Sequence, residues 1–277
     1  MIIGIVGLGL IGGSVAKSIK ARTDDMVLGI DLNEETMALA KMSGSIDGVL
    51  TDDKLASCDI IMIAVAPVAL AKWVEEKASL IKGTLLIDLC GVKRHIGKFI
   101  SEKAKENGFS YIGGHPMAGK EVSGFKNSNA TLFSGASMIL IPDEHSDILV
   151  LDKVKTYFLN IGFERITFST PEEHDMIIAY TSQLAHITSS AYIKSPTAQK
   201  HMGFSAGSYK DMTRVAKLDE NLWTELFLDN SDYLIDELKT LIGHLSDYLN
   251  ALETNDSEAL KELLKKGREL KLTAGGE

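Results

Sequence analysis

The chain has 277 residues, of which 45% are hydrophobic and 24% charged, and its formal net charge is -9. These values fit a globular protein of one large or two moderate domains. The acidic balance gives no electrostatic reason to bind nucleic acid or an anionic membrane. Its two cysteines, Cys58 and Cys90, form no CxxC pair, so we expect neither a disulfide framework nor a metal cluster. The sequence shows neither a basic leader nor an apolar stretch of about 20 residues, so we predict a cytoplasmic location.

The first predicted element is a strand over Ile2–Val6, which leads directly into a Gly-x-Gly-x-x-Gly turn and a helix. In this motif Gly7 permits the tight turn, Gly9 lets the backbone approach a pyrophosphate, and Gly12 lets helix and strand pack closely. The helix N-terminus presents free N–H groups to the phosphates. The chain is therefore expected to bind a dinucleotide. The expected cofactor contacts of this turn are Gly7, Gly9, Leu10, Ile11 and Gly12.

A second strand, predicted over Val27–Ile30, ends at Asp31. This carboxylate lies about 20 residues beyond the glycines, where an acidic residue accepts hydrogen bonds from the adenosine ribose. Leu32 and Asn33 follow it, with no Arg or Lys that could bind a 2′-phosphate. The pattern therefore favours NAD over NADP.

The first part of the chain continues as strands that alternate with helical segments, which indicates a doubly wound, mostly parallel sheet of the Rossmann type. The run Ile60–Val65 is apolar at every position, as expected of a central strand buried on both faces. It ends at Ala66 and Pro67, which should therefore lie in the ligand crevice as two further cofactor contacts. The other predicted strands are Thr84–Leu89, Tyr111–Ile112, Ser137–Ile141 and Phe163–Phe168.

After Phe168 the pattern becomes helical. Thr170, Pro171 and Glu173 form a helix start, with an N-cap, a proline at the first helical position and a capping-box acid. We therefore predict a Rossmann domain over 1–169 and an all-helical domain over 170–277. Leucines at helical spacing between Asp232 and Leu252 suggest a homodimer through this small domain, although the helices could also pack on each other.

Three clusters could carry chemistry. His115 lies between glycines after a predicted strand, where a histidine can accept a proton near neutral pH. Ser182 and His186 are four residues apart and share a helix face. Arg214 has small and apolar neighbours, which suits an arginine that binds a carboxylate, and Trp223 follows as a pocket wall or as core.

Together these clusters resemble the prephenate dehydrogenase family. The motifs that carry the resemblance are the glycine turn, His-Pro-Met-Ala-Gly at 115–119, Ser-Gln-Leu-Ala-His at 182–186, and Thr-Arg-Val-Ala at 213–216 with Trp223. The resemblance implies oxidative decarboxylation of prephenate to 4-hydroxyphenylpyruvate in tyrosine biosynthesis, with NAD as cofactor. It also implies that His115 is the catalytic base, that Arg214 anchors a substrate carboxylate, and that His186 and Ser182 contact the substrate.

The chain departs from the family pattern at two places. Gly91 stands where the family often has a serine that bonds the catalytic histidine or the substrate, so a backbone group or an ordered water is expected to orient His115, with the Cys90 thiol a weaker candidate. Gln183 and Ala185 replace the usual His and Pro of the helix motif.

Three alternatives remain open at this point. The substrate could be arogenate, whose side chain is an amino acid. The chain could be a dehydrogenase of the β-hydroxyacid type, although such an enzyme needs a catalytic lysine that nothing in the helical region singles out. It could also be a non-catalytic NAD(H)-sensing module, for which the His115 and Arg214 motifs would be expected to be lost.

Overall fold

The computed structural model describes residues 1–143 and 146–274, and it divides into two compact units, Met1–Asn230 and Ser231–Glu277. This division differs from the predicted boundary near Ser169. The reason is that α6 (Pro171–Ile178), the first helix after that boundary, contacts the Rossmann helix α4 (Arg94–Asn107). The division of the chain at 169 therefore stays a prediction.

The sheet of the first unit has eight strands in the order β3-β2-β1-β4-β5-β6-β7-β8. Neighbouring strands are parallel except for β6 and β7, so the prediction of a mostly parallel sheet is confirmed. The strand order reverses at β1 and β4, which is where such a sheet forms its ligand crevice. The strands are β1 (Ile2–Val6), β2 (Met26–Ile30), β3 (Gly48–Val49), β4 (Ile60–Ile63), β5 (Leu85–Asp88), β6 (Ser110–Pro116), β7 (Ser137–Pro142) and β8 (Arg165–Phe168).

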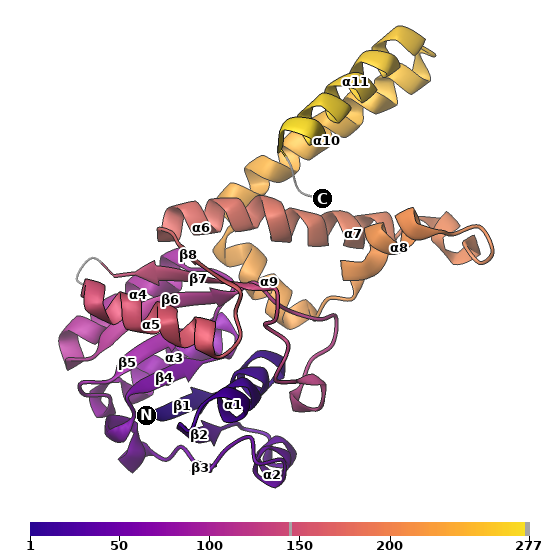
Figure 1. Cartoon of the computed structure of the whole chain (residues 1–277). Helices are drawn as coiled ribbons and strands as arrows, with labels where there is room; N and C mark the ends of the chain where they lie inside the picture. Colours follow the sequence, from indigo (N-terminus) through magenta and orange to yellow (C-terminus); the bar gives the residue numbers. More distant parts are fainter. Residues whose placement is uncertain (144–145, 275–277) are drawn as a thin grey trace. The chain divides into compact units, whose positions relative to one another are not determined.

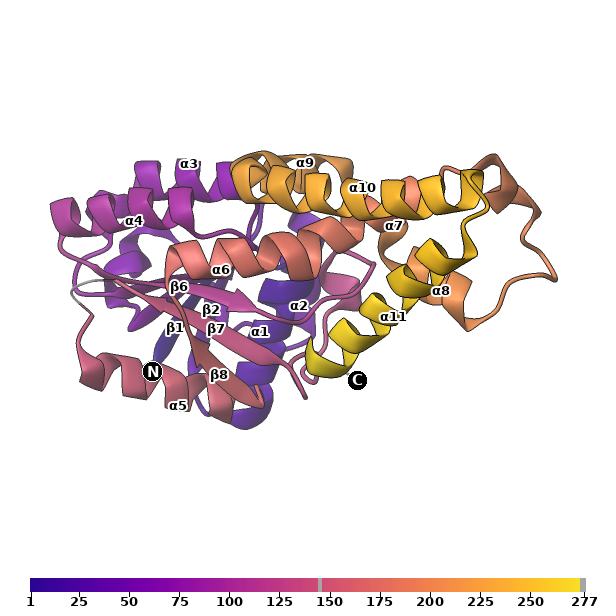
Figure 2. The same ribbon diagram turned by 90° about the horizontal axis from the view of Figure 1, so that it is seen from above.

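Helices cover both faces of the sheet, as the alternating pattern predicts (Figures 1 and 2). One apolar core joins the sheet to α1 (Leu10–Arg22), α2 (Glu34–Met42) and α5 (Ile148–Asn160). The other joins it to α3 (Pro67–Lys77) and α4. Because both faces are buried, the central strand β4 is apolar throughout.

Two strands differ from the sequence-based prediction. The pattern misses β3, because a strand of two residues has no periodicity to detect. It also ends the sixth strand at Ile112, whereas β6 continues to Pro116. Antiparallel pairing with β7 extends this strand through the glycines, and His115 pairs with Ile139. His115 therefore lies within the strand, close to its carboxyl end.

Beyond β8 the described chain contains only helices and turns, as predicted. Thr170 caps α6 by accepting a hydrogen bond from the backbone N–H of Glu173. After α6 the first unit continues with a π-helical turn (Ala179–Leu184), α7 (Ala185–Tyr192), α8 (Gly207–Thr213) and α9 (Glu220–Asp229), with short 3₁₀ turns at Pro196–Lys200 and Arg214–Ala216.

The second unit is a hairpin of α10 (Ser231–Glu253) and α11 (Ser257–Ala274). Asn255 lies between the helices with a φ of 52°, a left-handed conformation that asparagine adopts more readily than most residues. Over the described residues, no helix has both the length and the apolar character needed to cross a membrane. The apolar stripe of α10 includes Ile242, Leu245, Leu249 and Leu252, which are 53–63% exposed.

Candidate active site

The glycine turn between β1 and α1 has the geometry that its three predicted roles require. Gly7 has a φ of 83°, and a Cβ there would lie 2.5 Å from the Val65 side chain. A Cβ on Gly12 would lie 1.9 Å from the carbonyl oxygen of Gly7, so α1 contacts the backbone of the turn directly after β1. A Cβ on Gly9 would meet nothing within 4 Å, which leaves this backbone open to a phosphate. The N-terminus of α1 begins beside it, at Leu10.

Asp31 follows β2 and is bonded to the glycine turn. Its carboxylate accepts hydrogen bonds from the backbone N–H groups of Leu8, at 2.8 Å, and Asn33, at 2.9 Å. Each carboxylate oxygen has a second lone pair, which a ribose hydroxyl could use. The neighbouring Leu32 is fully exposed, so the ribose end of this site is open.

Ala66 and Pro67 lie at the start of α3, directly after the loop that follows β4. Glu225 of α9 accepts a hydrogen bond from the backbone N–H of Val68 in the first turn of this helix, at 3.1 Å. The helical segment after β8 thus reaches the crevice at the carboxyl ends of β1 and β4.

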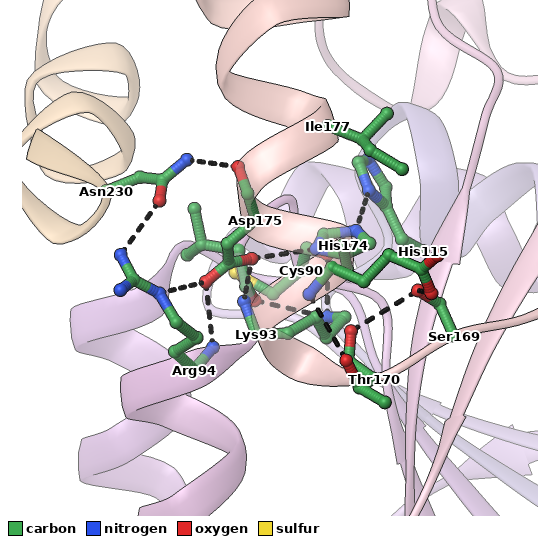
Figure 3. Close-up of polar contacts among 12 residues, drawn as sticks. Cys90, Lys93, Arg94, His115, Ser169, Thr170, His174, Asp175, Ile177 and Asn230 are labelled. Carbon is green, nitrogen blue, oxygen red and sulfur yellow. Dashed lines mark hydrogen bonds and ion pairs between the residues drawn. The ribbon is translucent and has the colours of Figure 1, made fainter. Parts of the chain in front are cut away.

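His115 is held by a second histidine from α6. Its Nδ1 lies 2.8 Å from Nε2 of His174, and the two rings meet edge to face (Figure 3). Its other ring nitrogen, Nε2, lies 3.9 Å from the position that a Cβ on Gly91 would occupy. The imidazole is therefore fixed through one nitrogen and presents the other toward the glycine.

Asp175 in turn holds His174. Its Oδ1 lies 2.7 Å from His174 Nδ1, and both side chains are completely buried. The same carboxylate accepts hydrogen bonds from the backbone N–H groups of Lys93 and Arg94, both at 2.9 Å. Because α4 begins at Arg94, the carboxylate lies at a helix N-terminus, where the dipole favours an anion. Figure 3 shows the contacts that connect Arg94 to Asp175, Asp175 to His174, and His174 to His115.

The surroundings shift the pKa of each group in this chain of hydrogen bonds. Burial acts to raise the pKa of Asp175, but hydrogen bonds from His174 and the α4 backbone outweigh it and lower that pKa. Burial lowers the pKa of His174, with a partly opposing effect from Asp175. Burial, His174 and the Lys93 ammonium together hold the pKa of His115 well below its usual value. His115 is therefore neutral, and able to accept a proton, at neutral pH.

A second buried network lies next to these residues. Lys93 Nζ forms an ion pair with Asp88 and donates to the carbonyl oxygen of Cys90 at 2.8 Å. The Tyr111 hydroxyl donates to the other Asp88 oxygen at 2.7 Å. The Cys90 thiol is buried, and burial raises its pKa to about 11, so it stays protonated. Lys93 and Asp88 thus place one buried cation and one buried anion beside His174.

The predicted substrate residues of the helical segment form a separate group. His186 Nδ1 donates to the backbone carbonyl of Ser182 at 2.8 Å, because the histidine lies one turn further along the helix. The Ser182 hydroxyl is therefore not what orients this imidazole. Trp223 packs against the His186 ring with a centroid distance of 3.8 Å, so it is a wall of this group.

Arg214 is exposed and forms an ion pair with Glu121, which lies in the loop after β6. The pKa of Glu121 is lowered by a bond from its own backbone N–H and then by Arg214. The pKa of His186 is lowered, first by burial, with a further contribution from Arg214. Arg214, Glu121 and His186 therefore lie close enough to interact electrostatically.

Helix α9 connects the two groups of side chains. Trp223 packs on His186, and one turn later Leu226 lies 3.5 Å from the position of a Cβ on Gly91, beside His115. Gln183 donates to the Leu226 carbonyl at 3.0 Å and accepts from the buried Asn230 at 2.8 Å. The glutamine that departs from the family motif thus holds α9 in place.

The structure corrects one expectation about His115. A backbone group or a water was expected to orient it, but His174 does so through Nδ1. His174, Asp175, Lys93 and Glu121 were not singled out as site residues. The available signal was a His-Asp pair four and five residues after the predicted helix start at Thr170, but nothing local indicates that this pair faces His115.

Comparisons with known proteins agree with this architecture. The chain matches the family models "Prephenate dehydrogenase, nucleotide-binding domain" over residues 15–167 and "Prephenate dehydrogenase, dimerization domain" over residues 170–266. It is 29% identical to cyclohexadienyl dehydrogenase of Zymomonas mobilis, covering 98% of this chain and 94% of that protein. It is 28% identical to prephenate dehydrogenase of Bacillus subtilis, covering 96% and 74%. Prephenate dehydrogenase from Aquifex aeolicus, in complex with hydroxyphenyl propionate and NAD+, superposes with a TM-score of 0.83 at 25% identity, covering 99% and 97%.

Proposed function

Because the chain belongs to the prephenate dehydrogenase family, we propose that it oxidises and decarboxylates prephenate with His115 as the base. The chain is an NAD-dependent oxidoreductase, and its product is 4-hydroxyphenylpyruvate, an intermediate of tyrosine biosynthesis. The observation that carries the role of His115 is its hydrogen bond to His174, which fixes the ring through Nδ1 and leaves Nε2 directed toward Gly91. A neutral imidazole held in this way can remove the proton of the substrate hydroxyl.

The other substrate contacts follow from the chemistry of prephenate, which has a ring hydroxyl, a ring carboxylate and a pyruvyl side chain. Arg214 anchors a carboxylate, because a guanidinium binds this group through two parallel hydrogen bonds. His186 and Ser182 contact the substrate at its other polar end. The electrostatic proximity of Arg214 and His186 supports a shared pocket for these contacts.

The glycine turn fits a dinucleotide, because the open Gly9 backbone and the α1 N-terminus can receive a pyrophosphate. Gly7, Gly9, Leu10, Ile11, Gly12, Asp31, Ala66 and Pro67 would hold NAD. When bound, NAD accepts the hydride from the carbon that carries the substrate hydroxyl. The side chains of this chain orient the substrate and accept the hydroxyl proton.

We further propose that residues 1–169 bind the cofactor and that residues 170–277 bind the substrate and form the dimer. The change from one family model to the other between residues 167 and 170 supports this division. A cytoplasmic location and the lack of nucleic-acid binding stay predictions from the composition.

The proposed activity is tested by following NADH formation with prephenate and with arogenate, each with NAD and with NADP. Turnover of prephenate with NAD is the expected result. Turnover of arogenate alone would make the chain an arogenate dehydrogenase. Oxidation of a β-hydroxyacid without turnover of prephenate or arogenate, or cofactor binding without any turnover, would contradict the proposal.

We expect a clear preference for NAD over NADP. Asp31 would repel a 2′-phosphate and accept a hydrogen bond from a free 2′-hydroxyl. The measurement is kcat/KM with each cofactor at saturating prephenate. Equal or better catalytic efficiency with NADP would contradict the assignment of Asp31.

Changes beside His115 at residues 90 and 91 should have small effects. Cys90→Ala is expected to keep kcat within about twofold, since a protonated thiol is a poor hydrogen-bond partner. Gly91→Ser should be tolerated, because its Cβ would meet Leu226 and His115 only at ordinary contact distances. A large loss of kcat in folded Cys90→Ala would show that the thiol orients the base.

We expect a homodimer held mainly by the helical region. The exposed stripe on α10 is apolar over several turns, and burying it against a second copy would remove this area from water. Sedimentation at about micromolar concentration should give a dimer mass, and Leu249→Lys should shift it toward the monomer. The control is Lys239→Glu, an exposed polar position on the same helix. A native protein that sediments as an active monomer would contradict this expectation.

A further inference from the structure

We propose that His115, His174 and Asp175 form a buried proton relay, in which His174 holds the positive charge that the base acquires during each turnover. His174 is a positioning residue in this scheme, because it acts through His115 and does not touch the substrate. The proposal rests on the proposed function only for the identity of the hydroxyl that loses its proton. Its geometry is independent of the substrate.

The hydrogen-bond partners fix the tautomer of both rings. Asp175 is ionised and bonded by backbone N–H groups, so its Oδ1 can only accept, and His174 Nδ1 must donate. The Nε2 of neutral His174 is therefore an acceptor. It faces His115 Nδ1 at 2.8 Å, so that nitrogen must donate. The lone pair of His115 is therefore left on Nε2, the nitrogen that faces Gly91. In other enzymes a carboxylate fixes the tautomer of a catalytic histidine in a similar way.

The charges around the relay favour a cation on His174 rather than on His115. Asp175 bonds His174 directly, and Asp88 also favours its charged form, whereas no carboxylate of the described residues is bonded to the His115 ring. Lys93 opposes a cation on either ring, but it is paired with Asp88. Other titratable groups nearby are Arg94 of α4, which is bonded to Asp175, and Tyr111 and Cys90, both protonated at neutral pH.

Protons and electron pairs balance over one turnover of the relay. As the C–H hydride leaves for the nicotinamide, the hydroxyl proton passes to His115 Nε2, and the proton on His115 Nδ1 passes to His174 Nε2. Loss of carbon dioxide breaks the bond to the ring carbon, and its electron pair makes the ring aromatic and leaves a phenolate oxygen. A phenol has a pKa of about 10, so this oxygen takes a proton from His115 Nε2. The Nδ1 proton then returns from His174, and both rings recover their starting tautomers.

This balance explains why the relay can be buried. The proton removed in the first step is consumed in the last, so the pair needs no path for proton exchange with solvent. A buried His174 with a buried Asp175 can store the charge briefly without releasing it.

The first experiment is an acid titration of the full-length protein with ¹⁵N-labelled histidine, followed by NMR of the ring nitrogens. Before titration, both His115 and His174 should carry their proton on Nδ1. The first proton taken up by the pair should convert His115 to its Nε2–H tautomer and make His174 doubly protonated. If His115 starts as the Nε2–H tautomer, or if it becomes the imidazolium first, the relay is wrong.

The second experiment separates charge storage from positioning with His174→Gln. The glutamine carbonyl can still accept from His115 Nδ1, but an amide cannot take up the proton. We expect kcat with prephenate to fall about tenfold or more, with the KM for prephenate and the NAD affinity changed by less than about twofold. The control is His95→Gln, an exposed histidine of α4 outside this network.

A His174→Gln enzyme with native kcat, and with His115 still protonated on Nδ1, would show that His174 only positions the base and would overturn the relay. If this variant does not fold, the titration of the native protein decides alone. If the native protein turns over neither prephenate nor arogenate, the proposed function fails, and the same titration still supports or refutes the relay.

Discussion

His115→Asn is expected to lower kcat for prephenate by about 100-fold or more, because removing a general base typically costs this much. Asparagine keeps some hydrogen bonding to the substrate but cannot accept its proton. NAD affinity should be nearly unchanged, since the glycine turn and Asp31 lie outside the contacts of this ring. The measurements are initial rates of NADH formation at saturating prephenate and direct titration with NAD.

The matched control for this variant is His95→Asn. His95 lies on α4 with its side chain 68% exposed and bonded to Asp229, so the same replacement there should leave kcat unchanged. A near-native kcat in His115→Asn would remove His115 from the mechanism. Loss of NAD binding in that variant would place the histidine in the cofactor site instead.

Arg214→Gln is expected to raise the KM for prephenate by about 30- to 150-fold, which corresponds to the loss of a charge-assisted carboxylate contact of about 2–3 kcal/mol. In the structure this guanidinium is bonded to Glu121, so a substrate carboxylate has to share or replace that partner. Cofactor affinity should be spared. Steady-state kinetics with prephenate, and NAD binding in its absence, make the comparison.

Lys217→Gln is the control for Arg214→Gln, because it removes an exposed positive charge three residues further along the chain. Its KM should stay near the native value, which separates a specific anchor from a general loss of positive charge. If Arg214→Gln leaves the KM unchanged and weakens NAD binding, Arg214 belongs to the cofactor site or to the fold.

Much of the fold could be predicted from local patterns. Apolar runs placed seven of the eight strands, because a sheet buried on both faces needs them to be nearly continuous. The glycine spacing placed the turn at Gly7 and the close contact at Gly12, since each follows from backbone sterics. The extension of β6 to Pro116 could not be predicted, because it depends on pairing with a strand more than 20 residues away.

The candidate site could be predicted only in part. His115, His186 and Arg214 stand in distinctive local motifs, and the structure gives each a charged or aromatic partner. The partners themselves could not be found in this way. His174 is 59 residues from His115, and Asp175 is 82 residues from Lys93, so only the packing of α6 on the sheet domain brings them together.

The position of Asp175 at the start of α4 couples the rate of the enzyme to its stability. The same carboxylate terminates the hydrogen-bond chain to His115 and stabilises the first turn of a core helix. A substitution there would reduce both the rate per folded molecule and the number of folded molecules in the cell, since small losses of stability lower protein abundance. Selection on the rate and selection on the stability therefore both act on this residue. A compensating mutation that restores only the fold would leave the enzyme slow.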